Sequence, residues 1–219
     1  MTTECNQNNN EETFIDLMAT RIKFTLIGEK EVGKTTIIKN FLKELPNTDK
    51  GINSYKAKFE RNKETFIFKL IDTPSEERFL QFTKSEYDTT NFALIIFDIT
   101  NKESFQKVNK WINHVRSSDN KDIELILIGN KKDLEKNRQV SKEEAIELAE
   151  KQKMKYYEIS ALKEEEIDPI FKTAFNEFLE KLKTEDEDKD NAENARLTLV
   201  NNSKNINKNF DEKKKNCCC

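Results

Sequence analysis

The clearest chemical signal in this chain is the stretch of residues 28–35, which reads Gly-Glu-Lys-Glu-Val-Gly-Lys-Thr. It satisfies the phosphate-loop pattern of a glycine, four residues, a second glycine, a lysine and a serine or threonine. In such a loop the backbone N–H groups and the following helix N-terminus cradle phosphates, Lys34 neutralises the terminal ones, and the Thr35 hydroxyl is available to Mg²⁺. The alternative is a chance glycine turn, but the whole chain has only four glycines and three of them flank candidate nucleotide motifs. The spacing therefore predicts a site for nucleotide phosphates.

A second group of polar residues, Gly-Asn-Lys-Lys-Asp at positions 129–133, ends a strand-like apolar run. The carboxylate of Asp133 can accept two hydrogen bonds from the N1–H and the N2 amino group of guanine, which adenine does not offer. Asn130 can tie this segment to the phosphate loop, and the alkyl stem of Lys131 can lie along the base. A backbone N–H in the later segment 158–162 can meet the guanine O6. On its own, Asn-Lys-Lys-Asp is most often a solvated turn, but at a strand end downstream of a phosphate loop it indicates guanine recognition.

The segments around these motifs alternate between two hydrophobic periods. Short apolar runs predict strands at residues 22–27, 65–71, 92–99, 123–128 and 156–159. Stretches with apolar residues at helical spacing alternate with them, so the sequence predicts β-α-β units and a mainly parallel sheet in an α/β fold. The exception is the run at 55–60, because its link to the next run is too short for a crossover, which predicts an antiparallel hairpin.

Composition limits the classes of function. The chain has 219 residues, and its 38 basic and 41 acidic residues give a formal net charge of −3, which argues against a general nucleic-acid binder. We expect no secretory signal, and the longest apolar run, residues 92–97, is far shorter than the ~20 residues of a membrane-spanning helix. The polar, charged ends predict three parts: a disordered N-terminal extension at 1–19, a folded domain at 20–183 and a flexible tail at 184–219.

Together, these motifs resemble those of the Ras-like small GTPases, and specifically of the Rab family. The resemblance covers about residues 20–183 and extends through Phe-Asp-Ile-Thr-Asn-Lys-Glu-Ser-Phe at 97–105, Arg-Gln-Val at 138–140 and Ser-Ala at 160–161. It implies a three-layer P-loop G domain: a six-stranded, mostly parallel sheet with one antiparallel strand and helices on both faces. It also implies a switch that binds GTP or GDP with Mg²⁺ and changes partners as the γ-phosphate comes and goes.

The resemblance assigns roles to individual residues. Lys34 and the position of Glu76 would be catalytic. Thr35 and, through water, Asp72 would hold Mg²⁺. Nucleotide contacts would come from Glu29, Lys30, Glu31, Val32, Gly33, Lys34, Thr35, Thr36, Ser75, Asn130, Lys131, Asp133, Ser160, Ala161 and Leu162.

The chain departs from the family in the second switch. Where the family usually reads Asp-Thr-Ala-Gly-Gln-Glu-Arg-Phe, residues 72–79 read Asp-Thr-Pro-Ser-Glu-Glu-Arg-Phe. Pro74 restricts the residue before it to extended conformations, and Ser75 lacks the conformational freedom of glycine. Glu76 stands where a glutamine orients the attacking water, and an ionised carboxylate donates no hydrogen bond and repels the phosphate. We therefore expect slow GTP hydrolysis.

The first switch departs as well, because the segment between Thr35 and Asp72 is shorter than in similar Rab proteins. The threonine that would close over Mg²⁺ in the GTP state has no clear equivalent. Thr48 is the candidate, and Lys50 and Asn53 are the alternatives. We expect selection of the base to be intact and sensing of the γ-phosphate to be altered.

The chain ends in Asn-Cys-Cys-Cys, which resembles the double geranylgeranylation signal of Rab proteins rather than a C-a-a-X box. Two lipid chains hold a protein firmly on a membrane, whereas one does so marginally. Residues 204–216 add five lysines against two acidic residues, which suits an anionic leaflet. The lipidated residues would be Cys218 and Cys219, with Cys217 as the alternative for either. The expected location is the cytosolic face of intracellular membranes, in exchange with the cytosol.

The family implies several protein partners: effectors, an exchange factor, an activating protein, a prenylation escort and a GDP-dissociation inhibitor. A second hypothesis is a pseudo-GTPase scaffold that holds guanine nucleotide without hydrolysing it, which single-turnover hydrolysis would distinguish. A third, a small-molecule kinase, would need a lid and phosphate-binding arginines, whereas the six arginines here are scattered along the chain. The single tryptophan, Trp111, is expected to be a packing residue.

Overall fold

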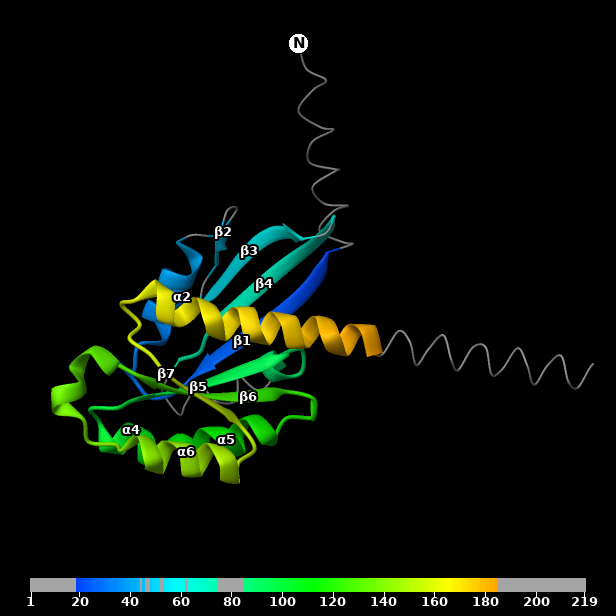
Figure 1. Ribbon diagram of the computed structural model, residues 1–219. Coiled ribbons are helices and arrows are strands. Elements are labelled where there is room, and N and C mark those ends of the chain that lie inside the picture. The colour runs from blue at the N-terminus through cyan, green and yellow to red at the C-terminus, as the bar shows by residue number, and fades with distance from the viewer. Residues whose placement is uncertain are drawn as a thin grey trace, which may run out of the picture. The chain divides into compact units, whose positions relative to one another are not determined.

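A computed structural model of the chain describes residues 19–43, 45, 48–51, 53–61, 63–74 and 85–184 (Figure 1). The chain divides into two compact units, Met1–Ala174 and Phe175–Cys219. The described part of the second unit, residues 175–184, is helical. Two groups of predicted site residues lie outside the described residues: Ser75 and Glu76, and the three terminal cysteines. None of the described helices has the length and apolar character needed to cross a membrane.

A single sheet forms the centre of the first unit, with the strand order β2-β3-β4-β1-β5-β6-β7. The strands are β1 (Thr20–Ile27), β2 (Thr48–Lys50), β3 (Ser54–Arg61), β4 (Glu64–Asp72), β5 (Phe92–Asp98), β6 (Glu124–Asn130) and β7 (Lys155–Glu158). β3 pairs antiparallel with both β2 and β4, while the pairs β4-β1, β1-β5, β5-β6 and β6-β7 are parallel. Among the described strands, β3 alone therefore runs against the others, and the mixed, mostly parallel sheet confirms the predicted fold class.

The expected number of six strands is wrong by one, because the described sheet has seven. The additional strand is β2, which pairs its three residues with Tyr55, Lys56 and Ala57 of β3. All three residues of β2 are polar and exposed. Such a strand has neither the alternation nor the apolar run that identifies strands in a sequence, so the hydrophobic pattern gave no signal for it.

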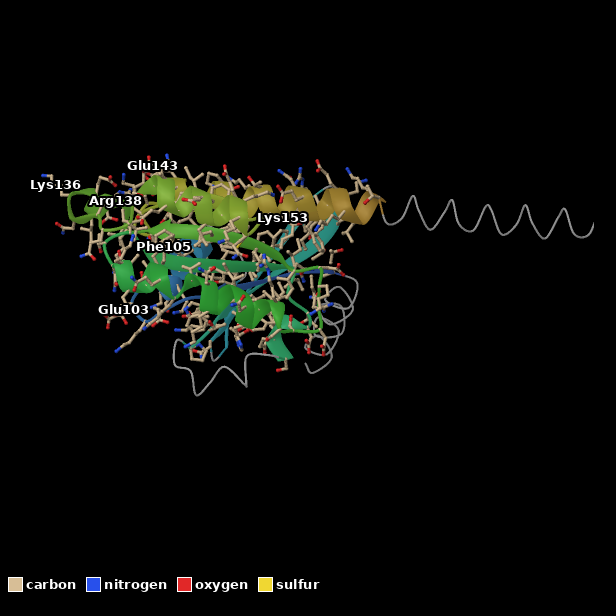
Figure 2. The ribbon with its side chains drawn as sticks, turned by 90° about the horizontal axis from the view of Figure 1, so that it is seen from below. Glu103, Phe105, Lys136, Arg138, Glu143 and Lys153 are labelled. Carbon is tan, nitrogen blue, oxygen red and sulfur yellow. The ribbon has the colours of Figure 1, made fainter. Side chains whose placement is uncertain are left out.

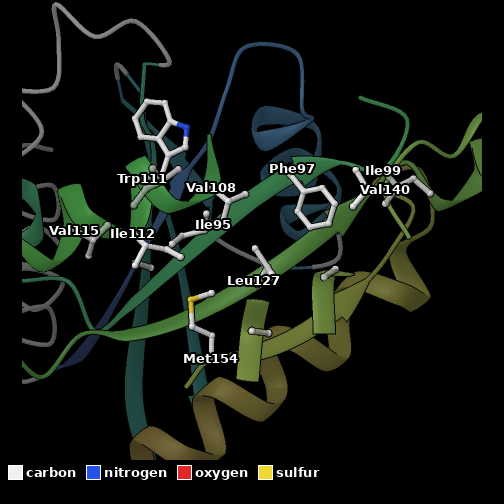
Figure 3. Packing of buried hydrophobic residues seen from close by; sticks show 14 of the residues in the cluster. Ile95, Phe97, Ile99, Val108, Trp111, Ile112, Val115, Leu127, Val140 and Met154 are labelled. Atoms are coloured by element: carbon white, nitrogen blue, oxygen red, sulfur yellow. The ribbon is translucent and has the colours of Figure 1, made fainter. Parts of the chain in front are cut away.

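Helices cover both faces of the sheet, as expected (Figure 1). On one face, α5 (Val108–Arg116) and α6 (Lys142–Lys151) pack on β5 and β6. Their buried side chains form one cluster with Ile95, Phe97 and Leu127 from the sheet (Figure 3). Short helices lead into this layer: α4 (Lys102–Gln106) and the 3₁₀ helix η2 (Lys132–Asn137).

Aromatic rings fill the other face of the sheet, under α2 (Lys34–Leu42) and the helix at residues 164–174. The rings of Phe41 and Phe171 stack with centroids 3.9 Å apart. Phe24 of β1 lies edge-on to Phe171 at 5.0 Å and stacks with Phe92 of β5 at 5.2 Å. Such aromatic contacts add to the burial of the rings themselves, so this layer holds the C-terminal end of α2, through Phe41, against the helix at 164–174 and the sheet.

Candidate functional site

The predicted phosphate loop connects the end of β1 to the start of α2, at the carboxyl edge of the parallel strands. Gly33 has a φ of 99°, and a Cβ atom built there would lie 2.2 Å from Nδ2 of Asn130. Only glycine meets both requirements, a left-handed backbone and close approach to another segment. The loop therefore has the strand-loop-helix geometry in which backbone N–H groups face a phosphate.

Lys34 begins α2 and folds back over the loop. Its Nζ donates hydrogen bonds to the carbonyl oxygens of Gly28, at 2.9 Å, and Glu29, at 2.8 Å. Burial lowers the pKa of this ammonium group to about 8, although Asp72 and Glu29 act in the opposite direction. Lys34 is thus a buried cation whose charge is poorly solvated. An anionic ligand beside it would raise this pKa back toward the ordinary lysine value.

Thr35 and Asp72 meet beside the loop, because β1 and β4 are parallel neighbours and Asp72 lies opposite Leu26. The Thr35 hydroxyl donates a hydrogen bond to Oδ2 of Asp72. A hydroxyl and a carboxylate are hard oxygen donors, and Mg²⁺ commonly takes one or two such protein ligands with water and substrate phosphates completing its shell. In the part of the chain that the structure describes, no three His, Cys, Asp or Glu residues gather into a metal cage. The donor set therefore fits a phosphate-bound Mg²⁺ rather than a structural metal.

A cavity of about 500 Å³ opens over the loop. Its floor and walls consist of Lys30, Glu31, Gly33, Lys34, Thr35, Thr36, Asn53, Asp72, Thr73 and Pro74. Lys30 and Glu31 form an ion pair of 3.6 Å with side chains 82% and 81% exposed, so this pair points into solvent at the rim of the cavity.

The candidates for the first-switch threonine lie in different places. Thr48 and Lys50 are exposed on β2, opposite Ala57 and Tyr55 of β3, and neither lines the cavity. Asn53 does line it, and its carbonyl oxygen accepts a hydrogen bond of 2.9 Å from the N–H of Asp72. Its φ of 54° places it in the left-handed region that asparagine tolerates. Of the three, Asn53 is therefore the one beside the predicted metal ligands.

The predicted base-binding residues at the ends of β6 and β7 form what we call the base end of the site. There, the side chain of Asn130 bonds both to the phosphate loop and to the segment after β7. Its Nδ2 donates to the carbonyl oxygen of Val32 at 2.7 Å, and its Oδ1 accepts from the N–H of Ala161 at 2.9 Å. Both polar atoms of this buried side-chain amide therefore have a hydrogen-bond partner. Asn130 therefore fixes the phosphate loop and the segment after β7 to the end of β6, as the sequence suggested for the first of these contacts.

Lys131 and Asp133 directly follow β6, so they also lie at the carboxyl ends of the parallel strands. Oδ1 of Asp133 accepts a 2.5 Å hydrogen bond from the hydroxyl of Ser160, which holds the carboxylate in place. Lys131 has a left-handed backbone, with φ 67°, and its Nζ pairs with Oδ2 of Asp98 at 2.6 Å. Leu162 is 71% exposed and follows the same turn. The structure thus brings the predicted base-binding residues together around one open surface.

Two supports of this surface were not recognised in the sequence. Glu158 accepts two 2.9 Å hydrogen bonds from the guanidinium of Arg138 and one of 2.6 Å from the hydroxyl of Tyr156. Burial opposes ionisation of Glu158, but the bonds from Arg138 and Tyr156 outweigh it and keep its pKa below the ordinary value. Figure 2 shows Arg138 at the end of the domain that also carries Lys136.

The second support is Glu166, near the start of the helix at 164–174. Its Oε2 accepts a 2.8 Å hydrogen bond from the N–H of Ser160. Burial opposes its ionisation, but this bond and the charges of Lys132 and Lys163 keep its pKa below the ordinary value. The Ser160 turn is therefore held from both sides. A glutamate at a helix start is a common sequence feature, so only its contact with Ser160 distinguishes it.

A larger cavity, of about 710 Å³, lies near the starts of β6 and β7, at the ends of these strands opposite to the phosphate loop. Its lining comes from the C-terminal ends of α5 and α6 and from the starts of β6 and β7 with the segments before them, and it includes Arg116, Lys121, Lys151 and Lys153. Figure 2 shows Lys153 far from Arg138. This cavity has neither a glycine loop nor a helix N-terminus in its lining, so the smaller cavity over Lys34 is the candidate site.

The strand-loop-helix cradle and the base motif, placed at one edge of a mostly parallel sheet, define a Ras-like P-loop GTPase domain. Residues 23–180 match the Ras family. The chain is 32% identical to Ras-related protein Rab-2B of Dictyostelium discoideum over 188 residues, which cover 82% of this chain and 93% of that protein. It is 34% identical to Ras-related protein SEC4 of Candida albicans (68% and 73% covered) and 36% identical to Ras-related protein Rab-21 of Bos taurus (68% and 69% covered). The chain belongs to the Rab family of Ras-like small GTPases.

Membership of this family supports a role as a GTP-binding switch in membrane trafficking, with GTP hydrolysis as the family's reaction.

Proposed function

We propose that this chain is a Rab-type switch that binds GTP or GDP with Mg²⁺, hydrolyses GTP slowly and recruits effectors to membranes in vesicle trafficking. The observation that carries the proposal is the placement of Asp133, because Ser160 fixes its carboxylate beside the turn that follows β7. A carboxylate held there can pair with the N1–H and N2 amino group of guanine, while the backbone of that turn can meet O6.

The phosphates would lie in the cavity over Lys34. The backbone of residues 29–33 and the start of α2 would bind them, and Lys34 would neutralise their charge. Thr35 directly and Asp72 through water would hold Mg²⁺, which, when bound, would neutralise charge that develops on the phosphate oxygens. Ser75 would add a backbone N–H on the γ side.

The test of this proposal is nucleotide selectivity. Purified protein should retain GDP or GTP, and ATP should compete roughly 10³-fold more weakly or worse, because adenine would leave the Asp133 carboxylate without its partners. Competition against a fluorescent GDP analogue measures this. ATP competing as well as GDP would contradict the assignment.

Slow hydrolysis is proposed from the sequence of the second switch. Glu76 cannot donate a hydrogen bond to the attacking water when ionised, and Pro74, which lines the cavity, fixes the backbone just before it. The second candidate function, a scaffold that binds guanine nucleotide and never hydrolyses it, shares the same binding site. Single-turnover GTP hydrolysis with and without an activating protein separates them, since complete retention of GTP in both would favour the scaffold.

Membrane attachment is proposed from the terminal cysteines. Two geranylgeranyl groups, on Cys218 and Cys219, would hold the protein on the cytosolic face of a membrane, with an escort protein and a GDP-dissociation inhibitor handling the lipids. Changing both to serine should release the protein to the cytosol without altering GDP affinity, as fractionation and a binding titration would measure. Single changes should have small effects because Cys217 can replace either neighbour. A double variant still on membranes would point to a protein receptor instead.

A further inference from the structure

Glu29, the second residue of the phosphate loop, is bonded to the helices on one face of the sheet. Its Oε1 accepts a 3.2 Å hydrogen bond from the indole N–H of Trp111, and its Oε2 lies 3.1 Å from Nζ of Lys107. Lys107 stands between α4 and α5 and pairs with a second carboxylate, Glu103, at 3.0 Å. The carboxylate of a loop residue is therefore fixed from outside the loop.

The same residue also contacts the phosphate site through its backbone. The carbonyl oxygen of Glu29, like that of Gly28, accepts a hydrogen bond from Nζ of Lys34 over the loop. This carbonyl and the carboxylate that is bonded to Trp111 belong to the same residue, so fixing the side chain also restrains the carbonyl. A continuous chain of contacts thus runs from α5 through Glu29 to the cation of the phosphate cavity.

The two partners of Glu29 differ in mobility. Trp111 is 2% exposed and lies at the margin of the hydrophobic cluster (Figure 3). A packed indole ring has little freedom to move, so its N–H is a fixed point. The Lys107 side chain is 40% exposed, and its ammonium is shared between two carboxylates. The contact therefore has a rigid component in the core and an adjustable one at the surface.

We propose that Trp111 and Lys107 are positioning residues for nucleotide binding, which act by fixing Glu29 and through it the loop carbonyl that holds Lys34. This inference rests on the proposed function of the loop as a phosphate site. Neither residue would touch the nucleotide. Because Trp111 is the single tryptophan of the chain, its fluorescence should report the state of the loop.

The kinetic test compares two carboxylates that share Lys107. Glu29→Ala removes the bonds to both Trp111 and Lys107 and should speed GDP release roughly tenfold, since hydrogen bonds to a charged group are lost. Glu103→Gln is the matched control, because it removes the other carboxylate of Lys107 and leaves the loop contact in place. We expect it to change the release rate by less than about twofold. Release of a fluorescent GDP analogue into excess GDP measures both.

The spectroscopic test uses the tryptophan itself. Removing nucleotide and Mg²⁺ from the wild type should shift the emission of Trp111, and the Glu103→Gln variant should show the same shift. Glu29→Ala should show none, because the ring is no longer connected to the loop. A purely structural role of Glu29 would lower stability and leave this response to nucleotide intact. Trp111→Phe deletes the N–H and should speed release to a similar extent in preparations that remain folded.

Failure of the inference is distinguishable from failure of the proposed function. A wild type that binds no guanine nucleotide would overturn the function. A wild type that binds GDP, together with equal release rates for Glu29→Ala and Glu103→Gln or an unchanged emission response in Glu29→Ala, would overturn the positioning role alone.

Discussion

The base end and the phosphate end of the nucleotide site are built in different ways. At the base end, side chains bond across segments that are distant in the chain. Asn130 joins the phosphate loop to the turn after β7, and that turn is fixed again by Asp133 and Glu166. The result is a surface on which Asn130, Asp133 and Ser160 each have a hydrogen-bond partner in another segment.

At the phosphate end, Lys34 bonds within the loop, and contacts from outside reach the loop through the Glu29 side chain and the Val32 carbonyl. Lys34 bonds to carbonyls five and six residues before it, and the bond from Thr35 to Asp72 reaches one neighbouring strand. Beyond Pro74 the chain continues into the second switch, whose sequence departs from the family. The contrast suggests that holding a nucleotide and sensing its γ-phosphate depend on separate parts of the molecule, so that the second can diverge while the first is kept.

The largest effect should come from the base end. Asp133→Asn replaces an acceptor of two hydrogen bonds with a group that offers a donor, so GDP affinity should fall at least about 100-fold while xanthosine diphosphate gains affinity. Competition binding with the two nucleotides measures the exchange. Lys136→Gln, on the same short helix, should leave both affinities within about twofold. An Asp133→Asn variant that keeps its preference for GDP would remove the distinction between the two ends.

The next effect concerns the support behind the base end. Arg138→Met leaves Glu158 without its bidentate partner and should lower the free energy of unfolding by about 2 kcal/mol, less than for a fully buried pair because the Arg138 side chain is 18% exposed. Lys43→Met breaks an exposed pair with Glu164 and should cost below about 1 kcal/mol. Chemical denaturation of nucleotide-bound protein gives both values. The Glu158 pKa is depressed, so its contribution is present above the ordinary glutamate range and is lost as pH falls through the lower folded-state value. Equal costs for the two variants would show that the Arg138 pair is not a special support.

A smaller effect is expected at the phosphate end. Glu76→Gln restores a hydrogen-bond donor and removes a negative charge, so single-turnover GTP hydrolysis at saturating Mg²⁺ should accelerate roughly tenfold or less. Adding Pro74→Ala and Ser75→Gly should raise the rate further, because these positions also set the γ-phosphate contacts. The reading of the second switch fails if the wild type already matches ordinary Rab proteins or if the triple variant is no faster than the wild type.

The smallest effect is a pH dependence through Lys34. Its pKa of about 8 in the free protein should rise when phosphates bind, so binding takes up a proton around pH 8. GDP affinity should therefore fall about fourfold between pH 7 and 8.5. Calorimetry in two buffers of different ionisation enthalpy measures the proton uptake. Lys34→Arg stays charged throughout this range and should show no uptake from this position.

The features that could be predicted from the sequence are those encoded by consecutive residues. The phosphate loop and the Asn-Lys-x-Asp motif are each encoded in fewer than ten consecutive residues, and strand-like apolar runs such as β5 are buried along their whole length. The hairpin of β3 and β4 followed from the shortness of its link. These features need no knowledge of which distant segments meet.

What could not be predicted depends on distant contacts or on weak patterns. β2 has three polar residues and gave no hydrophobic signal. Trp111 is a packing residue, as expected, but its bond to Glu29 joins positions 82 apart, and the Arg138–Glu158 pair joins positions 20 apart. Helical or strand periodicity describes neighbours along one element, so it carries no information about such pairs. Asn53 was one of three alternatives, and the cavity lining and its bond to the N–H of Asp72 distinguished it.

Contacts near the base end join residues that are far apart in the chain. This separation determines when the site can be completed during synthesis of the protein. The side-chain amide of Asn40 on α2 donates to the carbonyl of Ala161, 121 positions further along the chain. At roughly 5 to 20 residues per second, a ribosome needs about 6 to 24 s to travel between them. During that interval the nascent chain carries its phosphate loop without the segment that closes the base end. The complete site can therefore form only after residue 161 has been synthesised, when about three quarters of the chain already exists.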